Sequence, residues 1–147
     1  MKLSTKGRYG VRALLDIALN CEAGPVLLKD IARRQEISAQ YLEHLISPLI
    51  KAGILRSIRG CRGGIILAKS PQEVGLSQVV EILEGSVAPV ECVDNPDICS
   101  RASSCVTRDV WKAMKTATMG VLEGITLKDL IERHKEKAGS RAGIYSI

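Results

Sequence analysis

Apolar side chains recur three and four positions apart through the first fifty residues, as they do on the inward face of an α-helix. Gly24-Pro25, the short stretch 35–37 and Gly53 interrupt this pattern. The predicted helices cover residues 4–21, with Ser4 as a candidate N-cap, 28–34 and 38–52. The turn between the last two is only three residues long, which is the spacing of a helix-turn-helix, and residues 38–52 would form its recognition helix.

Two short runs with the alternation of β-strands come next, Ile54–Arg59 and Ile65–Ala68. The five residues between them include three glycines, so the tip of this hairpin has access to positive φ. The hairpin carries three arginines, Arg56, Arg59 and Arg62. A loop that is only solvated seldom needs so many, which favours a function for them. An arginine-tipped hairpin directly after a helix-turn-helix can reach the backbone or the minor groove of DNA. The pattern therefore predicts a winged helix-turn-helix.

The second half of the chain is predicted to hold three helices and one loop. The helices are 77–84, capped by Ser77, then 103–123, and a last one that begins at Thr126 with Asp129 in its first turn. The stretch from Gly85 to Ser100 has two prolines and no period, which favours a loop. The fold class is therefore mainly α. We expect four parts: a winged helix-turn-helix domain (1–84), a cysteine-bearing loop (85–102), a dimerisation helix with a final helix (103–137) and a flexible tail (138–147).

The predicted long helix carries an apolar stripe at alternating steps of three and four residues. The stripe consists of Val106, Val110, Ala113, Met114, Ala117, Val121 and Leu122. The last helix offers only Leu127, Leu130 and Ile131 to cover it. Pairing with a second copy would bury the stripe and create a two-fold axis, so we expect a homodimer. The alternative is a helix that folds back on its own domain.

The charge of the chain is unevenly distributed. Residues 1–70 hold 12 Lys and Arg against 5 Asp and Glu, whereas residues 71–147 hold 9 against 11. A basic first half favours a polyanionic partner. With three Tyr, one Trp and no Phe, the chain has too few aromatic side chains for a platform that stacks single-stranded nucleic acid. No apolar run is long enough to span a bilayer, so we expect a cytoplasmic protein with no membrane partner.

The outer face of the predicted recognition helix offers side chains that can read base edges. These are Ser38, Ala39, Gln40, Tyr41, Glu43 and His44. Gln40 has the amide geometry that pairs with adenine, and the carboxylate of Glu43 can accept a hydrogen bond from the amino group of cytosine. The helix N-terminus also favours a phosphate.

Three segments of the chain together resemble the Rrf2 family of bacterial winged-helix transcriptional regulators, and within it the iron–sulfur cluster regulators. The segments are MKLSTKGRYGVRALLDIALN, LKDIARRQEISAQYLEHLISPLIKAGIL and SIRGCRGGIILAKSP, and the similarity runs from Met1 to about Ile131. The resemblance implies a homodimer on a palindromic operator in double-stranded DNA, and it leaves open an indirect contact with RNA polymerase. It implies DNA contacts from Ser38, Gln40, Tyr41, Glu43 and Arg59 with Gly60 and Gly63; Arg62, at a tip position where relatives vary, is added because of its charge.

Three of the five cysteines form the pattern C-x6-C-x5-C, at Cys92, Cys99 and Cys105. Without a secretion signal, an odd number of cysteines argues against a disulfide scaffold. Three thiolates on a loop that enters a helix can converge on one metal, and the helix dipole would lower the pKa of the Cys105 thiol. The residues alone leave three readings open: an iron–sulfur cluster, zinc, or cysteines that merely replace alanine or serine.

The resemblance implies that Cys92, Cys99 and Cys105 hold an iron–sulfur cluster, with 2Fe–2S favoured over 4Fe–4S. The fourth ligand is open. The iron–sulfur regulators of the family carry a histidine where this chain has Arg108, and the members that sense nitric oxide use an acidic residue where it has Arg8. A guanidinium offers no lone pair to a metal. The remaining candidates are Asp109, Glu91, Asp94, Asp97, His44 and an exogenous thiol.

We therefore expect a DNA-binding transcriptional regulator, a repressor of iron–sulfur cluster biogenesis genes that senses through its cluster. The alternative is the same winged helix sensing thiol oxidation, cysteine supply, nitric oxide or zinc. A thiol oxidoreductase is disfavoured, because the chain has neither a C-x2-C pair nor a glycine-rich nucleotide fingerprint. We expect no enzymatic activity.

Overall fold

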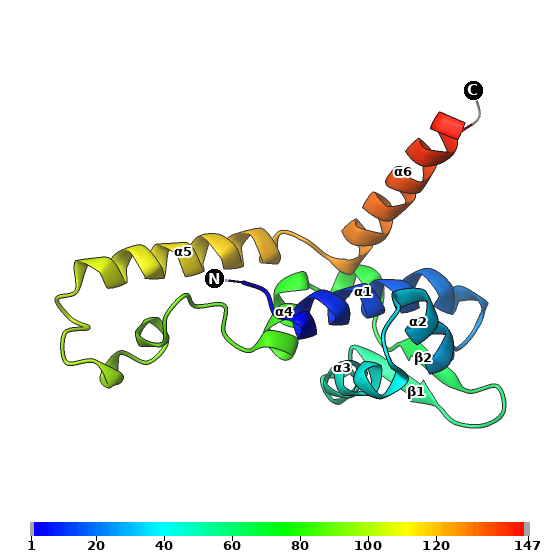
Figure 1. The fold of residues 1–147 in the computed structure, drawn as a ribbon, viewed down its shortest axis with the longest axis horizontal. Helices are drawn as coiled ribbons and strands as arrows, with labels where there is room; N and C mark the ends of the chain where they lie inside the picture. Colours follow the sequence, from blue (N-terminus) through cyan, green and yellow to red (C-terminus); the bar gives the residue numbers. More distant parts are fainter. Residues whose placement is uncertain (1, 146–147) are drawn as a thin grey trace.

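A helix-turn-helix followed by a hairpin forms one end of the molecule, and two long helices extend from it (Figure 1). The computed structural model describes residues 2–145. Its helices are α1 (Thr5–Asn20), α2 (Leu28–Gln35), α3 (Ala39–Lys51), α4 (Leu76–Glu84), α5 (Val106–Glu123) and α6 (Leu127–Tyr145). Strands β1 (Leu55–Ile58) and β2 (Gly64–Leu67) pair antiparallel, with Leu55 opposite Leu67. The mainly helical winged fold predicted from the sequence is confirmed.

The hydrophobic core lies between α1 and the helices that surround it, which are α2, α3 and α4. Its fully buried side chains include Leu14 and Ile17 of α1, Leu42 and Leu49 of α3, and Ile54, which precedes β1. The hairpin of β1 and β2 is the wing. Between α2 and α3 the chain turns at Glu36, whose φ of 56° places it in the left-handed region. This conformation ends α2 within a single residue and makes the tight turn possible. Ile37, in the turn, packs against the core.

Helices α1 and α4 cross at the two glycines of the STKGRYG segment. A Cβ at Gly7 would overlap the carboxylate of Glu84, and a Cβ at Gly10 would overlap Leu83. The Glu84 carboxylate accepts hydrogen bonds from the N–H groups of Ser4 and Gly7, both at 2.9 Å, and from the Ser4 hydroxyl at 2.6 Å. The last residue of α4 therefore caps the N-terminus of α1, where a negative charge is favourable. Ser4 is the N-cap residue of α1, as expected from the sequence, but its own side chain makes no capping hydrogen bond.

A buried ion pair fixes α1 to α2. The carboxylate of Asp16 is only 5% exposed, and the guanidinium of Arg34 donates to it at 2.6 Å from Nη2 and at 2.9 Å from Nε. The amide of Gln35 donates to the same carboxylate at 2.9 Å. The hydrogen bonds to Asp16 raise the pKa of Arg34 above its ordinary value. A buried charge is tolerated only when it is paired and hydrogen-bonded in this way.

Helix boundaries in the second half depart from the sequence expectation at three places, one of which is the start of α5 at Val106 instead of residue 103. Helix α4 is capped by Gly75 and begins at Leu76, so Ser77 lies inside its first turn rather than at its cap. The reason is a tertiary contact, since the Leu76 N–H bonds to the Ile125 carbonyl at 2.9 Å. Helix α6 continues through Tyr145, beyond the expected end near residue 137, and residues 146–147 of the expected tail lie outside the described residues.

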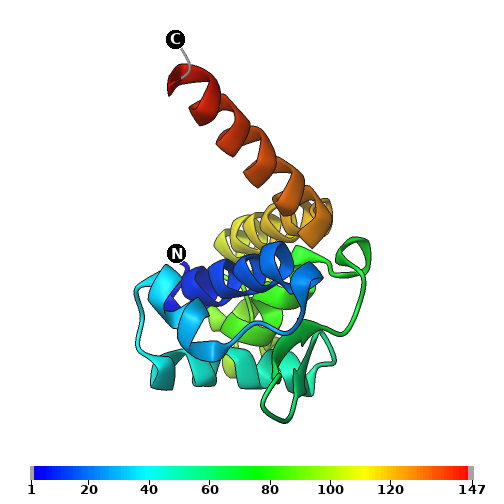
Figure 2. The same ribbon diagram turned by 90° about the vertical axis from the view of Figure 1, so that its right-hand side faces the viewer.

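The predicted cap of α6 is confirmed. The Asp129 carboxylate accepts from the Thr126 N–H at 2.8 Å, and the Asp129 N–H donates to the Thr126 hydroxyl at 3.3 Å. These two bonds form a reciprocal cap at the N-terminus of the helix. From there α6 leaves the body on the side opposite α3 (Figure 2). None of the helices in residues 2–145 is long and apolar enough to cross a membrane.

The α1–α4 crossing predicts the effect of adding a methyl group at Gly10. Gly10→Ala should lower the free energy of unfolding by about 1–2 kcal/mol, because Leu83 must leave its place in the core. Gly139→Ala is the matched control, since a Cβ there meets no atom and alanine is the better helix former. The measurement is denaturant unfolding followed by circular dichroism.

A double variant checks the cause. Gly10→Ala combined with Leu83→Ala should be destabilised by less than the sum of the two single changes, because the second removes the atoms that the first displaces. Strict additivity would contradict the close contact between the two positions.

Candidate nucleic-acid interface and cysteine loop

The recognition helix α3 presents two distinct faces. Its inner side chains, among them Leu42, Leu45 and Leu49, are buried, whereas Gln40 and Glu43 are exposed. Ser38 is the N-cap, and its hydroxyl accepts a hydrogen bond from the Tyr41 N–H at 3.1 Å. Because capping uses one lone pair of the Ser38 hydroxyl, its O–H remains available as a donor at the exposed end of the helix.

Tyr41 is half-buried and is held by a neighbour on α1. Its ring meets that of Tyr9 edge to face, with 6.4 Å between the centroids and 83° between the planes. The guanidinium of Arg12 lies 5.1 Å from the centre of the Tyr9 ring and donates to the Gln35 side chain at 3.0 Å. One polar and aromatic network thus joins α1, α2 and α3. The sequence analysis missed Tyr9, and the only signal for it was an aromatic residue on the polar face of an amphipathic helix.

Glycines give the wing its shape. Gly60 has a φ of 108°, a Cβ at Gly63 would collide with the Ile58 carbonyl, and a Cβ at Gly64 would collide with the Val26 carbonyl. Val26 and Ile65 exchange two backbone hydrogen bonds, of 2.9 and 2.8 Å, which anchor the hairpin to the body. The wing is therefore a fixed hairpin rather than a mobile loop at its base.

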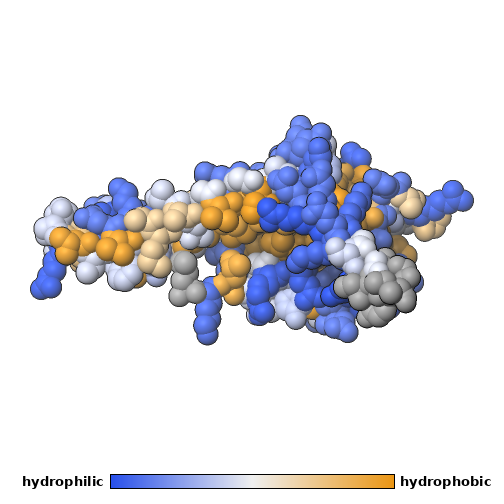
Figure 3. Space-filling view, turned by 90° about the horizontal axis from the view of Figure 1, so that it is seen from above, coloured by the Kyte–Doolittle hydropathy of each residue, from blue (hydrophilic) through white to orange (hydrophobic). Residues whose placement is uncertain are grey.

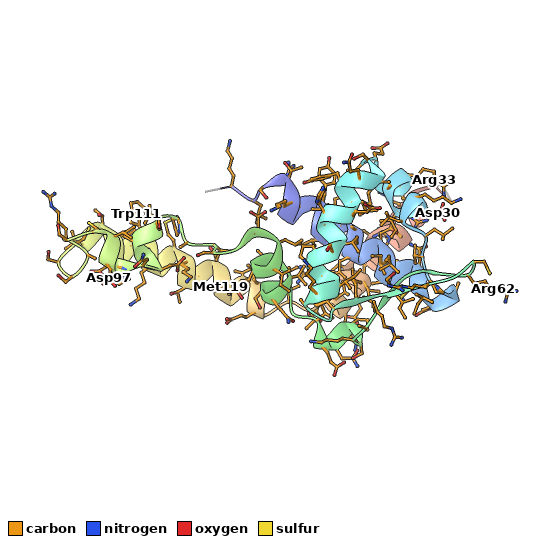
Figure 4. The ribbon with its side chains drawn as sticks, turned by 90° about the horizontal axis from the view of Figure 1, so that it is seen from below. Asp30, Arg33, Arg62, Asp97, Trp111 and Met119 are labelled. Atoms are coloured by element: carbon orange, nitrogen blue, oxygen red, sulfur yellow. The ribbon has the colours of Figure 1, made fainter. Side chains whose placement is uncertain are left out.

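The outer face of α3 and the wing lie on the same side of the molecule (Figure 2). A groove of roughly 640 Å³ separates them, lined by Glu43 and Lys51 of α3, by Gly60 and Gly63 of the wing and by aliphatic side chains such as Ile46. The arginines of the wing are exposed, and Figure 4 shows Arg62 at its far end. The structure thus brings residues of the predicted recognition helix and wing to one surface.

The three clustered cysteines are free thiols, and the structure does not gather all three of them at one point. Cys92 and Cys105 are half-buried and Cys99 is exposed. Within residues 2–145, no group of three or more Cys, His, Asp or Glu side chains is placed to hold a metal ion. The donor set itself fits an iron–sulfur cluster or zinc, since thiolates are the preferred ligands of both.

Cys105 is the N-cap of α5, one position before the first turn where the sequence analysis placed it. Hydrogen bonds from the Thr107 hydroxyl, 3.2 Å from the sulfur, and from the Arg108 backbone N–H lower the pKa of the Cys105 thiol. Asp109 opposes this effect through its charge. The predicted direction of the shift in the pKa of Cys105 is confirmed, and it is toward the thiolate form that binds metals.

Two side chains of α5 contact the segment around Cys92. Arg108 donates from Nε to the Cys92 carbonyl at 2.8 Å, and Lys115 lies 2.6 Å from the carboxylate of Asp94. Asp94 also accepts a hydrogen bond from Ser86. Lys115 and then Ser86 lower the pKa of the Asp94 carboxyl. Of the fourth-ligand candidates, Asp94 is thus engaged elsewhere, and His44 lies on α3, at the other end of the molecule (Figure 1).

Helix α5 is covered on one face only. Trp111, Lys115 and Leu122 are half-buried, and no residue of α5 is fully buried within the described chain. The apolar stripe is open, with Val106 76% exposed, Val110 54% and Val121 65%. Apolar side chains follow this extended part of the molecule in Figure 3. Apart from the half-buried Leu122, the described chain leaves the predicted dimerisation stripe open to solvent.

Comparison with known proteins agrees with this architecture. The family model of Rrf2, described as an iron-dependent transcriptional regulator, matches residues 3–133. Protein rrf2 of Nitratidesulfovibrio vulgaris is 45% identical over 131 residues, which cover 89% of this chain and 87% of that protein. The structure of IscR from T. potens has a TM-score of 0.77 at 40% identity, covering 93% of this chain and 90% of that one.

A second solved relative is CymR, named as the global cysteine regulator of B. subtilis. It has a TM-score of 0.75 at 37% identity and covers 90% of this chain and 98% of its own. The resemblance identified from the sequence motifs is therefore confirmed. With the winged fold, the outward-facing recognition helix and these relatives in agreement, the chain belongs to the Rrf2 family of transcriptional regulators.

Proposed function

We propose that this protein binds a palindromic operator in duplex DNA as a homodimer, and that its cysteine loop holds an iron–sulfur cluster that controls this binding. One observation carries the proposal: the outer face of α3 and the arginine-bearing wing share one side of the molecule, with a groove between them. A helix fits the major groove of B-DNA, and a narrow hairpin can follow the adjacent backbone or minor groove.

The DNA contacts are assigned to both elements of this surface. On α3, Ser38 and Tyr41 lie where phosphates approach, and Gln40 and Glu43 point toward base edges. In the wing the contacts come from Arg59, Gly60, Arg62 and Gly63. Since the exposed Gly60 has no side chain, a phosphate can approach the backbone of the wing closely at this position. Phosphate contacts set the position of the protein, while Gln40 and Glu43 give it sequence preference.

The homodimer rests on the uncovered stripe of α5. Side chains as exposed as Val106 and Val121 lose contact with water when a second α5 packs against them. A two-fold axis through α5 would hold two copies of α3 for two half-sites, which lie about 34 Å apart when separated by one turn of DNA. A palindromic operator matches that symmetry.

Cys92, Cys99 and Cys105 are the residues proposed to hold the cluster, 2Fe–2S in preference to 4Fe–4S. A bound cluster supplies sensitivity to iron supply and to oxidants. This chain provides a thiol of lowered pKa at Cys105 and an exposed thiol at Cys99. Position 108 offers no lone pair, so the fourth ligand comes from Asp109, Glu91, Asp97 or an exogenous thiol. The similarity to IscR and the match to an iron-dependent regulator family support a regulator that responds to iron, and repression of iron–sulfur cluster biogenesis genes is what the family resemblance implies.

A second function is favoured by the similarity to CymR, which is almost as strong as that to IscR. In this alternative the same winged helix responds to cysteine supply or thiol oxidation, and the exposed Cys99 and reactive Cys105 act without a metal. Anaerobic reconstitution with iron and sulfide separates the two: roughly two of each per monomer supports the 2Fe–2S cluster, and none supports the metal-free sensor.

Removal of the Arg59 side chain tests the DNA-binding surface. Arg59→Ala should weaken operator binding by about 1–3 kcal/mol and reduce the salt dependence by about one phosphate contact. Lys135→Ala, which removes the same charge from exposed α6 on the opposite side, is the matched control. Fluorescence anisotropy with labelled operator DNA at several salt concentrations gives both values. Equal affinity of the two variants would remove Arg59 from the interface.

A charge within the stripe tests the dimer. Val110→Glu places a carboxylate in the proposed interface, where an unpaired charge costs several kcal/mol, and should yield a monomer with reduced affinity for a two-half-site operator. Thr116→Glu adds the same charge to an exposed position of α5 outside the stripe and should leave the dimer intact. Multi-angle light scattering gives the mass. A monomeric wild type, or a dimeric Val110→Glu variant, contradicts the proposed interface.

Single serine substitutions test the cluster. Cys92→Ser, Cys99→Ser and Cys105→Ser should each abolish iron and sulfide loading, whereas Cys21→Ser and Cys61→Ser should load like the wild type. Loading should change the affinity for at least one operator by five-fold or more, about 1 kcal/mol, in the wild type and in the two controls only. Iron analysis, visible absorbance and binding isotherms provide the measurements. Loading that survives in the first three variants would rule out the assigned ligands.

A further inference from the structure

The cysteine loop is attached to α5 by two contacts that use no thiol. Arg108 donates from Nε to the Cys92 backbone carbonyl at 2.8 Å, and Lys115 forms an ion pair with Asp94 at 2.6 Å. Lys115 follows Arg108 by seven positions, which is about two helical turns, so both project from the same face of α5. The segment 92–94 is therefore tied to the helix at both of its ends.

The second contact extends back to the beginning of the loop. Asp94 also accepts a hydrogen bond from the Ser86 hydroxyl, and the Ser86 oxygen accepts one from the Ala88 N–H at 3.0 Å. Lys115 and Asp94 are both partly shielded from solvent, which makes their attraction stronger than that of a fully exposed pair. The Asp94 carboxylate therefore joins three parts of the chain, namely residues 86–88, residues 92–94 and α5.

Trp111 occupies the same face of α5, between the two contacts. It follows Arg108 by three residues and precedes Lys115 by four, and it is half-buried while the opposite face of the helix is exposed. Figure 4 shows Trp111 at the same end of the molecule as Asp97 of the loop. Since Trp111 is the one tryptophan of the chain, its fluorescence reports on how closely the loop covers α5.

We propose that Arg108 and Lys115 are positioning residues that hold the Cys92–Asp94 segment against α5 before any metal is bound. This inference rests on the proposed function of the loop as a metal site. The two contacts keep Cys92 beside the start of α5, where Cys105 lies, and they leave the exposed Cys99 as the ligand that moves. A loop that is ordered in advance loses less conformational entropy when it takes up a metal, so it binds faster and more tightly.

The first experiment uses the metal-free full-length chain. Arg108→Ala and Lys115→Ala should each increase the quenching of Trp111 fluorescence by acrylamide, and the deuterium exchange of amides 86–105, about two-fold or more. Lys112→Ala, an exposed position of the same helix, is the matched control and should change neither. The far-ultraviolet circular dichroism of all variants should match that of the wild type.

A charge reversal distinguishes the ion pair from a general effect of substitution. Lys115→Asp alone places two carboxylates together and should loosen the loop most, and the double variant with Asp94→Lys should restore wild-type quenching. Quenching and exchange equal to those of the wild type in Arg108→Ala and Lys115→Ala, or a double variant as loose as Lys115→Asp, would overturn the proposal.

The second experiment adds ferrous iron and sulfide anaerobically to the same proteins. Arg108→Ala and Lys115→Ala should load at least about three-fold more slowly than the wild type and than Lys112→Ala, because their loops must first be ordered. If the wild type takes up no iron, the proposed cluster fails while the fluorescence result still decides the positioning role. If the variants load as fast as the wild type, the positioning role fails and the cluster stands.

Discussion

The close crossing of α1 and α4 is the contact on which the other parts of the structure depend. It exists because Gly7 and Gly10 leave room for Glu84 and Leu83, and it is completed when the Glu84 carboxylate takes up the free N–H groups at the start of α1. Helix α1 in turn supports the recognition helix α3, because Tyr9 of α1 packs against Tyr41 of α3. Since the cysteine loop begins directly after Glu84, any rearrangement of that loop acts close to this crossing.

Elements whose signals are local could be predicted from the sequence. The helices of the first half follow from apolar periodicity, the wing from its glycines, and the start of α6 from the Thr126–Asp129 pair, because each signal lies within a few residues of the element it forms. The cap of α1 could not be predicted, since Ser4 and Glu84 lie 80 residues apart in the chain. The start of α4 at Leu76 likewise depends on a carbonyl of residue 125, which no local pattern reveals.

The recognition helix and the cysteine loop also differ in how far the sequence predicts them. The outward side chains of α3 follow from helical geometry once the inward ones are known, so their exposure was predictable. The cysteine loop has no hydrophobic period. Its sequence identifies the three thiols but does not predict the path of the backbone between them. Arg108 illustrates the difference: the sequence shows only that it is no metal ligand, whereas the structure gives it a partner in the Cys92 carbonyl. A hydrogen bond between a side chain and a distant backbone carbonyl cannot be recognised from residue types or their spacing in the sequence.

The construction of the wing bears on how such a protein changes over generations. Its geometry is set by Gly63 and Gly64 and by the backbone pairing of Val26 with Ile65, none of which involves the side chains at the tip. Cys61 and Arg62 are exposed there. Substitutions at these two positions can therefore change the chemistry of the hairpin tip at little cost in folding. The shape of the hairpin depends on its glycines and on backbone pairing, so single codon changes at the tip alter the side-chain chemistry there and leave the geometry intact.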